Sequence, residues 1–243
     1  MYKYTLKYER LIDIPKHIIN VNNIPENIDL RDKFPLCFNQ GEIASCTANA
    51  IVAVYAYYDA NFMGSRMFLY YNERQADNDI EDDKGSTLSQ GIHVAENIGI
   101  CSEEEWKYDI KLFDIRPPEK CYLEAKNHKA NDYYHIEQTE NAIKATLAKG
   151  YPILLGITVY ESFESEEVAK NGIVSLPLPN ENLLGHHAVV LVGYNNNQWI
   201  LRNSWGTKWG DNGYFYLPFS YLTDQYLATD LWVLTLGLCP RNS

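Results

Sequence analysis

Long apolar runs are absent from this chain of 243 residues. No stretch approaches the roughly eighteen consecutive apolar residues that a membrane-spanning helix requires. The N-terminal stretch MYKYTLKYERLIDIPKHIIN is charged throughout, whereas a signal peptide needs an apolar core. We therefore expect a cytoplasmic protein that makes no membrane contact, with non-classical export or association with a virion as the alternatives.

Basic residues and cysteines are also scarce. The sequence has 21 Lys and Arg against 32 Asp and Glu, a net charge of -11, so it lacks the basic surface that binding to nucleic acid requires. The cysteines are odd in number and widely scattered, which argues against a secreted protein held together by disulfides. They are Cys37, Cys46, Cys101, Cys121 and Cys239.

The composition is that of a packed globular protein, with 46% hydrophobic and 13% aromatic residues. Residues 1–28 have no helix caps and no sustained period, and Pro15 and Pro25 interrupt them, so we expect an extended arm there. The folded body is expected to begin near Asp29.

Helical patterns dominate the first half of this body. Ser45 suits an N-cap, and the small or apolar residues that follow it have the spacing of one helix face. They are Ala48, Ile51, Val52, Tyr55 and Tyr58. Further helices are predicted over residues 66–77, 87–98, 117–130 and 139–148.

Strand patterns take over after Pro152. Short runs rich in branched and aromatic residues, separated by Gly, Pro or Asn, predict an antiparallel sheet. They are ILLGITVY, HHAVVLVGY, QWILRNSW, GYFYLP and DLWVLTL. Helices segregated from strands indicate an α+β protein with a mainly helical lobe (about 29–132), a mainly β lobe (about 133–243), and a site in the groove between them.

Cys46 stands where a small, polar run meets the first predicted helix, in QGEIASCTANAI. In the first turn of a helix, unpaired backbone N–H groups and the helix dipole favour the thiolate, which is the nucleophilic form of cysteine. The same position also suits a structural cysteine, because free cysteines are among the most buried residues. Taken alone, the segment leaves both interpretations open.

A thiol nucleophile needs a base, and GHHAVVLVGY offers His186 and His187 at the start of a strand. Because side chains alternate along a strand, only one of the two imidazoles can face the groove, and alternation does not say which. In RNSWGTKWGDNGYFYLP, the Asn203 carboxamide can accept a hydrogen bond from one imidazole nitrogen and fix the tautomer. Trp205 can shield that bond from water.

Gln40 lies six residues before Cys46. Its amide can pair with the Cys46 backbone N–H to hold the oxyanion that forms when a thiolate attacks a carbonyl. Each of these features alone also suits a purely structural role. The order Gln, Cys, His, Asn, with Ser-Trp-Gly after the Asn, is more specific than any of its parts.

In this combination the sequence resembles the papain-like cysteine peptidases, from about Pro25 onward. The resemblance is carried by DLRDKFPLCFNQGEIASCTANA, GHHAVVLVGY and RNSWGTKWGDNGYFYLP. His187 lies 141 residues after Cys46, within the roughly 130 to 150 typical of papain and cathepsins. SRMFLYYNERQ, GICSEEEWKYD and GYPILLGITVYESF resemble the variant known from bacteria and viruses.

The resemblance implies a papain-like two-lobed fold with the active site in the groove, and a role for each candidate residue. Cys46 would be the nucleophile, Asn203 the orienting residue and Gln40 the oxyanion glutamine. The resemblance also selects His187 as the base, because the histidine of the family directly precedes Ala-Val. The expected activity is hydrolysis of peptide bonds through a thioester acyl-enzyme, without a metal or cofactor.

The resemblance further implies that Gly85 and Ser86 offer backbone groups to an extended peptide or protein substrate, with Trp205 on the leaving-group side. Two other readings of the same residues stay open. The scaffold can be a non-catalytic peptide-binding module, or the triad can perform acyl transfer instead of hydrolysis.

Two departures from the family pattern stand out. Ile43 replaces the cysteine that normally forms a disulfide near the nucleophile, and Ala44 and Thr47 replace the usual Gly and Trp. The long propeptide of the family is also replaced by residues 1–28. We expect this arm either to inhibit the enzyme by lying across the groove or to pack elsewhere as structure.

Overall fold

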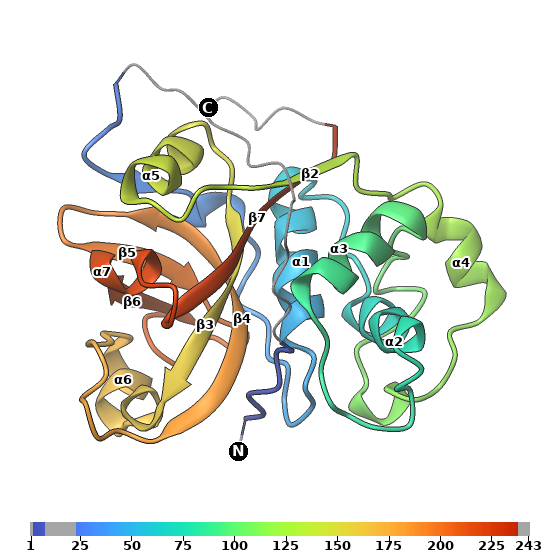
Figure 1. Cartoon of the computed structure of the whole chain (residues 1–243). Coiled ribbons are helices and arrows are strands. Elements are labelled where there is room, and N and C mark those ends of the chain that lie inside the picture. The colour runs from blue at the N-terminus through green and yellow to red at the C-terminus, as the bar shows by residue number, and fades with distance from the viewer. Residues whose placement is uncertain (1, 8–22, 238–243) are drawn as a thin grey trace.

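The computed structural model describes residues 2–7 and 23–237. One group of helices lies on one side and an antiparallel sheet, with the remaining helices around it, on the other, and helix α1 (Cys46–Tyr58) runs between them (Figure 1). The fold is therefore α+β, as the segregated sequence patterns predict. The residue bounds of the two lobes stay a prediction, and most of the N-terminal arm, residues 8–22, lies outside the described residues.

The helical side follows α1 with α2 (Arg66–Ala76), α3 (Leu88–Asn97) and α4 (Glu119–Ala125). Ser65 caps α2 and Thr87 caps α3, each accepting a backbone N–H three residues later. Helix α4 is shorter than predicted, because the chain after Ala125 turns back toward α3, where the Ala130 N–H donates to the Ala95 carbonyl at 2.9 Å.

The remaining helices lie among the strands. Helix α5 (Glu140–Ala148) begins after Thr139, as predicted, and the two short helices α6 (Glu166–Asn171) and α7 (Phe219–Thr223) were not expected from the sequence. Single 3-10 turns are η1 (Arg31–Lys33), η2 (Ile110–Leu112) and η3 (Glu161–Glu164). Within the described residues, no helix has the length and apolar character needed to cross a lipid bilayer.

Seven strands among the described residues form one antiparallel sheet. They are β1 (Ile28–Asp29), β2 (Asp132–His135), β3 (Ile153–Tyr160), β4 (Leu183–Tyr194), β5 (Gln198–Arg202), β6 (Tyr214–Pro218) and β7 (Ala228–Thr235). Their order is β2-β7-β3-β4-β5-β6, and β1 pairs with the end of β4. A turn at Asn195–Asn197 connects β4 to β5 as a hairpin.

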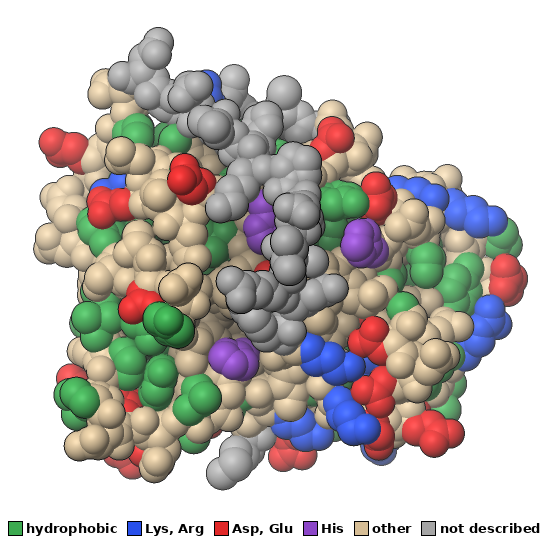
Figure 2. Space-filling view, in the orientation of Figure 1, with side chains coloured by type: hydrophobic (Ala, Val, Ile, Leu, Met, Phe, Trp, Pro, Cys, Tyr) green, Lys and Arg blue, Asp and Glu red, His purple; other side chains and the backbone are tan. Residues whose placement is uncertain are grey.

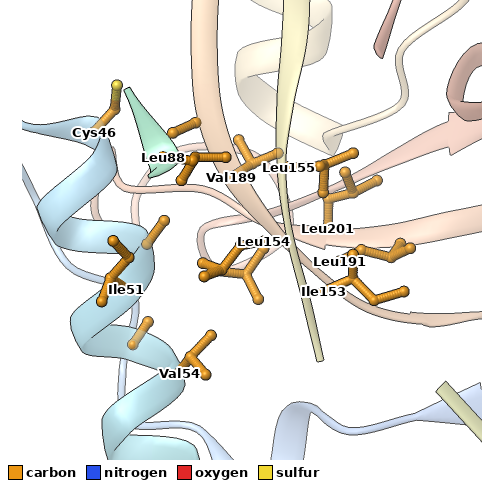
Figure 3. Packing of buried hydrophobic residues seen from close by; sticks show 14 of the residues in the cluster. Cys46, Ile51, Val54, Leu88, Ile153, Leu154, Leu155, Val189, Leu191 and Leu201 are labelled. Atoms are coloured by element: carbon orange, nitrogen blue, oxygen red, sulfur yellow. The ribbon is translucent and has the colours of Figure 1, made fainter. Parts of the chain in front are cut away.

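Helix α1 is the centre of the core. The sequence suggested one apolar stripe, but every residue from Cys46 to Tyr58 is buried, so the helix is enclosed on all sides. Its Ile51 and Val54 point toward Leu154 of β3 and the other apolar residues of the sheet (Figure 3). Because the sheet packs against α1 in this way, the position of its first residue is fixed relative to β4.

Candidate active site

Cys46 is the first residue of α1, and its sulfur points past the end of the helix (Figure 3). The residue is completely buried. Backbone N–H groups of Cys46, Thr47 and Ala188 interact with the sulfur and favour its thiolate form. The contact with Ala188 places the thiol beside β4, next to His187.

Ser45 occupies the N-cap position of α1, as predicted, but its side chain makes no capping hydrogen bond to the helix. Its hydroxyl lies 2.6 Å from the Tyr108 hydroxyl and accepts a hydrogen bond from the Asn49 amide at 3.0 Å. The serine side chain is thus used elsewhere. The N–H groups of the first turn remain available to negative charge at Cys46.

His187 and Asn203 are hydrogen-bonded, with 2.8 Å between the imidazole Nε2 and the amide Oδ1. Asn203 Oδ1 also accepts the backbone N–H of Ser204 at 2.7 Å, which orients the amide. Because Oδ1 is an acceptor, Nε2 must carry the imidazole proton, and neutral His187 keeps an unprotonated Nδ1. That Nδ1 is buried and has no hydrogen-bond partner among residues 2–7 and 23–237.

His186 faces the other side of β4, as alternation requires. Its ring is only partly buried, and its Nδ1 lies 3.4 Å from the Thr158 hydroxyl. His187, in contrast, is completely buried, and its ring centroid lies 5.2 Å from that of Trp205. The structure therefore brings His187, and not His186, to Asn203 and Trp205.

Gln40 is held in the same region by the residue after Asn203. The Gln40 N–H donates to the Ser204 carbonyl at 2.8 Å, and Gln40 Oε1 accepts the Ser204 hydroxyl at 2.6 Å. Gln40 Nε2 donates to the Ile43 carbonyl at 2.9 Å. Since an amide nitrogen has two hydrogens, one N–H of this buried side chain remains for another acceptor.

Burial keeps both reactive groups uncharged. Desolvation raises the pKa of Cys46 to about 12, opposed by the backbone N–H of Ala188, and the charge of Glu73 adds to the rise. Desolvation also lowers the pKa of His187 to about 4, although the bond to Asn203 opposes this shift. In this closed structure, thiol and imidazole are therefore both neutral near pH 7.

The first segment of the chain, residues 2–7, contacts the same site. The Leu6 N–H donates to the His186 carbonyl at 3.1 Å, and the Lys7 N–H donates to the Ser86 carbonyl at 3.0 Å. One segment thus hydrogen-bonds both to β4 and to the loop before α3. Figure 1 shows the N-terminus entering between β4 and α1.

Aromatic rings of this segment cover the imidazole. Tyr2 stacks on Trp205 with ring centroids 4.2 Å apart and planes 5° apart. Tyr4 meets the His187 ring edge-on, with centroids 6.2 Å apart, and its hydroxyl lies 2.5 Å from a Glu164 carboxylate oxygen. The contact with Tyr4 contributes to the burial of the imidazole, and burial lowers the pKa of His187.

The backbone of the groove is shaped for this close approach. Gly85 has a φ of +74°, and a Cβ there would lie 2.2 Å from the Thr5 carbonyl oxygen. Gly185 has a φ of +145°, and its Cβ would lie 2.4 Å from the Tyr4 carbonyl oxygen. Only glycine allows both the left-handed backbone and the contact.

Charged groups hold the same segment at the rim of the helical side. Lys3 lies 2.5 Å from Asp83, and Lys7 lies 3.0 Å from Asp77 and 3.2 Å from Asp79. Figure 2 shows positive and negative side chains gathered over this part of the molecule, around the loop after α2. Each exposed pair contributes little alone, so the rings and the buried backbone bonds carry most of the attachment.

The residues predicted to bind substrate lie where the N-terminal segment lies. The Ser86 carbonyl accepts the Lys7 N–H, Gly85 packs against the Thr5 backbone, and Trp205 stacks on Tyr2. Their role toward a substrate stays a prediction. No group of three or more possible metal ligands occurs within residues 2–7 and 23–237.

Sequence reasoning missed Glu73, a carboxylic acid buried below the nucleophile. Its Oε2 accepts the Thr47 hydroxyl at 2.6 Å, whereas its Oε1 has no hydrogen-bond partner. Gly91 of α3 leaves room for it, since a Cβ there would lie 2.5 Å from Oε1. The only sequence signal is Thr47, a small polar residue where the family pattern has Trp.

Comparison with known proteins identifies the family. The model of the papain family of cysteine proteases matches residues 24–222, which is most of the chain. The chain belongs to this papain family. Its predicted resemblance to papain-like cysteine peptidases is thereby confirmed.

Two relatives of this papain-family chain come from a virus and a bacterium. An uncharacterized peptidase C1-like protein of Acanthamoeba polyphaga mimivirus is 42% identical over 212 residues, covering 81% of this chain and 68% of the viral protein. Xylellain, a cysteine protease from Xylella fastidiosa, superposes with a TM-score of 0.84 at 33% identity and 96% coverage of both chains. The predicted similarity to the bacterial and viral variant is confirmed.

More distant members share the fold. Digestive procathepsin L 3 of Tenebrio molitor superposes with a TM-score of 0.73 at 17% identity, covering 96% of this chain and 76% of that protein. The chain spans only part of several other curated relatives, between 36% and 64% of their length.

Glu73 should make stability depend on pH. Burial raises its pKa from 4.5 to about 8, and the Thr47 bond only partly opposes this. Between these values the folded state keeps a proton that the unfolded state has lost, so the free energy of unfolding falls as pH rises through this window. Between pH 5 and 9, the wild type should lose roughly 2–4 kcal/mol of its free energy of unfolding through Glu73, and Glu73→Gln should not show this loss. Denaturant unfolding at each pH measures the difference.

The comparison uses the slope against pH, because the amide also changes absolute stability. Glu104→Gln at the exposed surface controls for removing one negative charge from the whole chain. Parallel pH profiles for Glu73→Gln and the wild type would show that Glu73 does not gain a proton on folding.

Proposed function

We propose that the chain is a cysteine peptidase that hydrolyses peptide bonds through a thioester acyl-enzyme, and that residues 2–7 hold it in a latent state. The observation that carries the proposal is the state of the His187 imidazole. Its Nε2 is tied to Asn203, and its buried, unpartnered Nδ1 remains for a proton from the adjacent Cys46 thiol. Because most buried polar side-chain atoms have a hydrogen-bond partner, an unpartnered imidazole nitrogen on the strand that contacts the thiol supports a role as base.

The reaction begins when His187 Nδ1 takes the Cys46 proton. The thiolate attacks the carbonyl carbon of the scissile peptide bond, and the free Gln40 N–H and the Cys46 backbone N–H hold the oxyanion. The imidazolium then protonates the leaving amine, and a thioester remains on Cys46.

Water completes the cycle. Neutral His187 Nδ1 accepts a proton from a water molecule as that water attacks the thioester carbonyl. The second oxyanion collapses, the acid product leaves, and Cys46 recovers its proton from the imidazolium. Throughout, Asn203 accepts the Nε2 proton and keeps the ring in the same tautomer and orientation.

Cys46→Ala should abolish cleavage of a peptide amide or ester substrate, lowering kcat by at least about 10⁴-fold, because no other group can form the acyl-enzyme. It should also remove the site of labelling by an epoxide or iodoacetamide, located by mass spectrometry. Cys121→Ala, which removes another buried free thiol outside this site, is the control and should keep the activity. Turnover by Cys46→Ala would contradict the proposed nucleophile.

Latency follows from two effects of residues 2–7. The segment fills the groove, and its rings exclude the water that would stabilise a thiolate and an imidazolium. With the pKa of Cys46 at about 12 and that of His187 at about 4, the nucleophile stays protonated. Displacing the segment rehydrates both groups and allows the charged pair to form.

Leu6 anchors this segment. Its side chain is 4% exposed and fills the space above Gly156, where a Cβ would lie 2.7 Å from Leu6 Cδ2. A charge cannot be buried there without a partner, so Leu6→Asp should release the segment. We expect Cys46 alkylation at pH 7 to become about tenfold faster or more, together with a rise in peptidase activity.

Leu178→Asp is the matched control, because Leu178 is 73% exposed and lies outside the groove. Deletion of residues 1–27, which leaves β1 in place, should act like Leu6→Asp. Alkylation rates that are equal in the wild type, Leu6→Asp and the deletion variant would show that residues 2–7 do not control Cys46.

The cysteines support a reducing location such as the cytoplasm. Cys37, Cys46, Cys101 and Cys121 are all free, and Cys239 lies outside the described residues. Disulfides are rare in cytosolic proteins, where thiols are kept reduced. We propose that the chain works there.

A further inference from the structure

One side chain outside the catalytic set contacts the segments that supply both oxyanion donors. Tyr108, in the loop before η2, donates its hydroxyl to the Gln40 carbonyl at 2.8 Å. The same hydroxyl lies 2.6 Å from Ser45 Oγ, directly before Cys46. We infer that Tyr108 is a positioning residue that sets the distance between the two donors of the oxyanion hole, an inference that rests on the proposed function.

The hydrogen bonds at Tyr108 have one consistent direction. A phenol has a single hydrogen, and Tyr108 gives it to the Gln40 carbonyl, so Ser45 must donate to the Tyr108 oxygen. The Ser45 oxygen in turn accepts the Asn49 Nδ2–H at 3.0 Å. The result is a chain from Asn49 through Ser45 and Tyr108 to Gln40, in which each bond polarises the next.

The phenol ring is fixed by a buried cation. The Arg66 guanidinium carbon lies 4.0 Å from the centre of the Tyr108 ring and 4.5 Å from that of Phe38. Arg66 is itself held by Glu103 through two hydrogen bonds of 2.9 and 2.5 Å. Its Nη1 also donates to Asn49 Oδ1 at 3.3 Å, so the same cation contacts two members of the hydrogen-bonded chain, Asn49 and Tyr108.

Gln40 needs such a bond because it lies in a turn between Asn39 and Ser45, outside any helix or strand. Ser204 ties Gln40 to the strand side of the molecule. Tyr108 is the contact that ties it to the start of α1. An oxyanion hole works only when both donors reach the oxyanion within about 2.7–3.1 Å, so this spacing affects the transition state more than substrate binding.

The test uses the full chain carrying Leu6→Asp as the parent, with Tyr108→Phe, Ser45→Ala and Tyr57→Phe added separately. Tyr57→Phe is the matched control, because Tyr57 also donates its hydroxyl to a backbone carbonyl, that of Gly150 at 2.7 Å, at the far end of α1. Steady-state kinetics on a peptide ester give kcat and KM. Infrared difference spectra of a cinnamoyl acyl-enzyme give the frequency of the thioester carbonyl.

We expect Tyr108→Phe to lower kcat about tenfold while KM changes less than about twofold. Its acyl-enzyme carbonyl should shift to higher frequency, because a misplaced oxyanion hole polarises the bond less. Ser45→Ala should shift the carbonyl frequency in the same direction. In the variant that combines Tyr108→Phe with Ser45→Ala, kcat should fall by less than the product of the two single effects. Tyr57→Phe should change neither kcat nor the frequency.

Each other result has a distinct meaning. A carbonyl frequency and kcat in Tyr108→Phe equal to those of Tyr57→Phe would overturn the positioning role and leave the peptidase proposal standing. A Leu6→Asp parent that forms no acyl-enzyme would overturn both proposals together.

Discussion

Burial of helix α1 along its whole length determines where the other parts of the site can lie. A helix leaves its first N–H groups without partners, and such groups are costly when they end in a protein interior. Here that end carries Cys46, and Ser45, the residue placed to cap it, is bonded to Tyr108 and Asn49 instead. The exposed backbone dipoles therefore act on the thiol, and packing of α1 against the sheet brings that thiol to β4.

The sheet supplies the other half of the site through its register. Val190 of β4 pairs with Arg202 of β5, so Asn203, one residue further, reaches diagonally back to His187. Arg202 also donates to the carbonyls of Pro35 and Leu36, both at 2.7 Å, in the segment that leads to Gln40. One strand end thus positions both Asn203, the partner of the imidazole, and the segment that leads to Gln40.

Some of this arrangement could be predicted from the sequence, since periodicity and turn residues are local signals. The strands after Pro152 and the helices α2, α3 and α5 follow directly from such patterns, and the family motifs selected His187 over His186. Other features depend on tertiary contacts that no local pattern encodes. The hydroxyl of Ser45 prefers Tyr108, a residue distant in sequence, over its own helix, so a good N-cap residue does not cap.

The N-terminal segment and the buried acid show the same limit. Nothing in MYKYTLK indicates that the Leu6 side chain is buried in the fold. Its space exists only because Gly156 of β3 has no side chain. Glu73 reads as a surface residue of a polar helix until Gly91 of α3 is seen to make room for its carboxyl group. In both cases a glycine on a distant element leaves the space, and the local sequence does not show that this glycine lies nearby.

Desolvation shifts the pKa of three buried groups, Cys46, His187 and Glu73, toward the neutral form. They differ in what surrounds them. Glu73 is enclosed by α1, α2 and α3, so water cannot reach it unless the core opens. The imidazole of His187, in contrast, is contacted by Tyr4, and the segment of residues 2–7 is bonded to β4 directly beside it. Under the proposed latency, displacing residues 2–7 would change the dielectric around Cys46 and His187 but leave Glu73 enclosed and neutral, so a thiolate at Cys46 would form without a second negative charge below it.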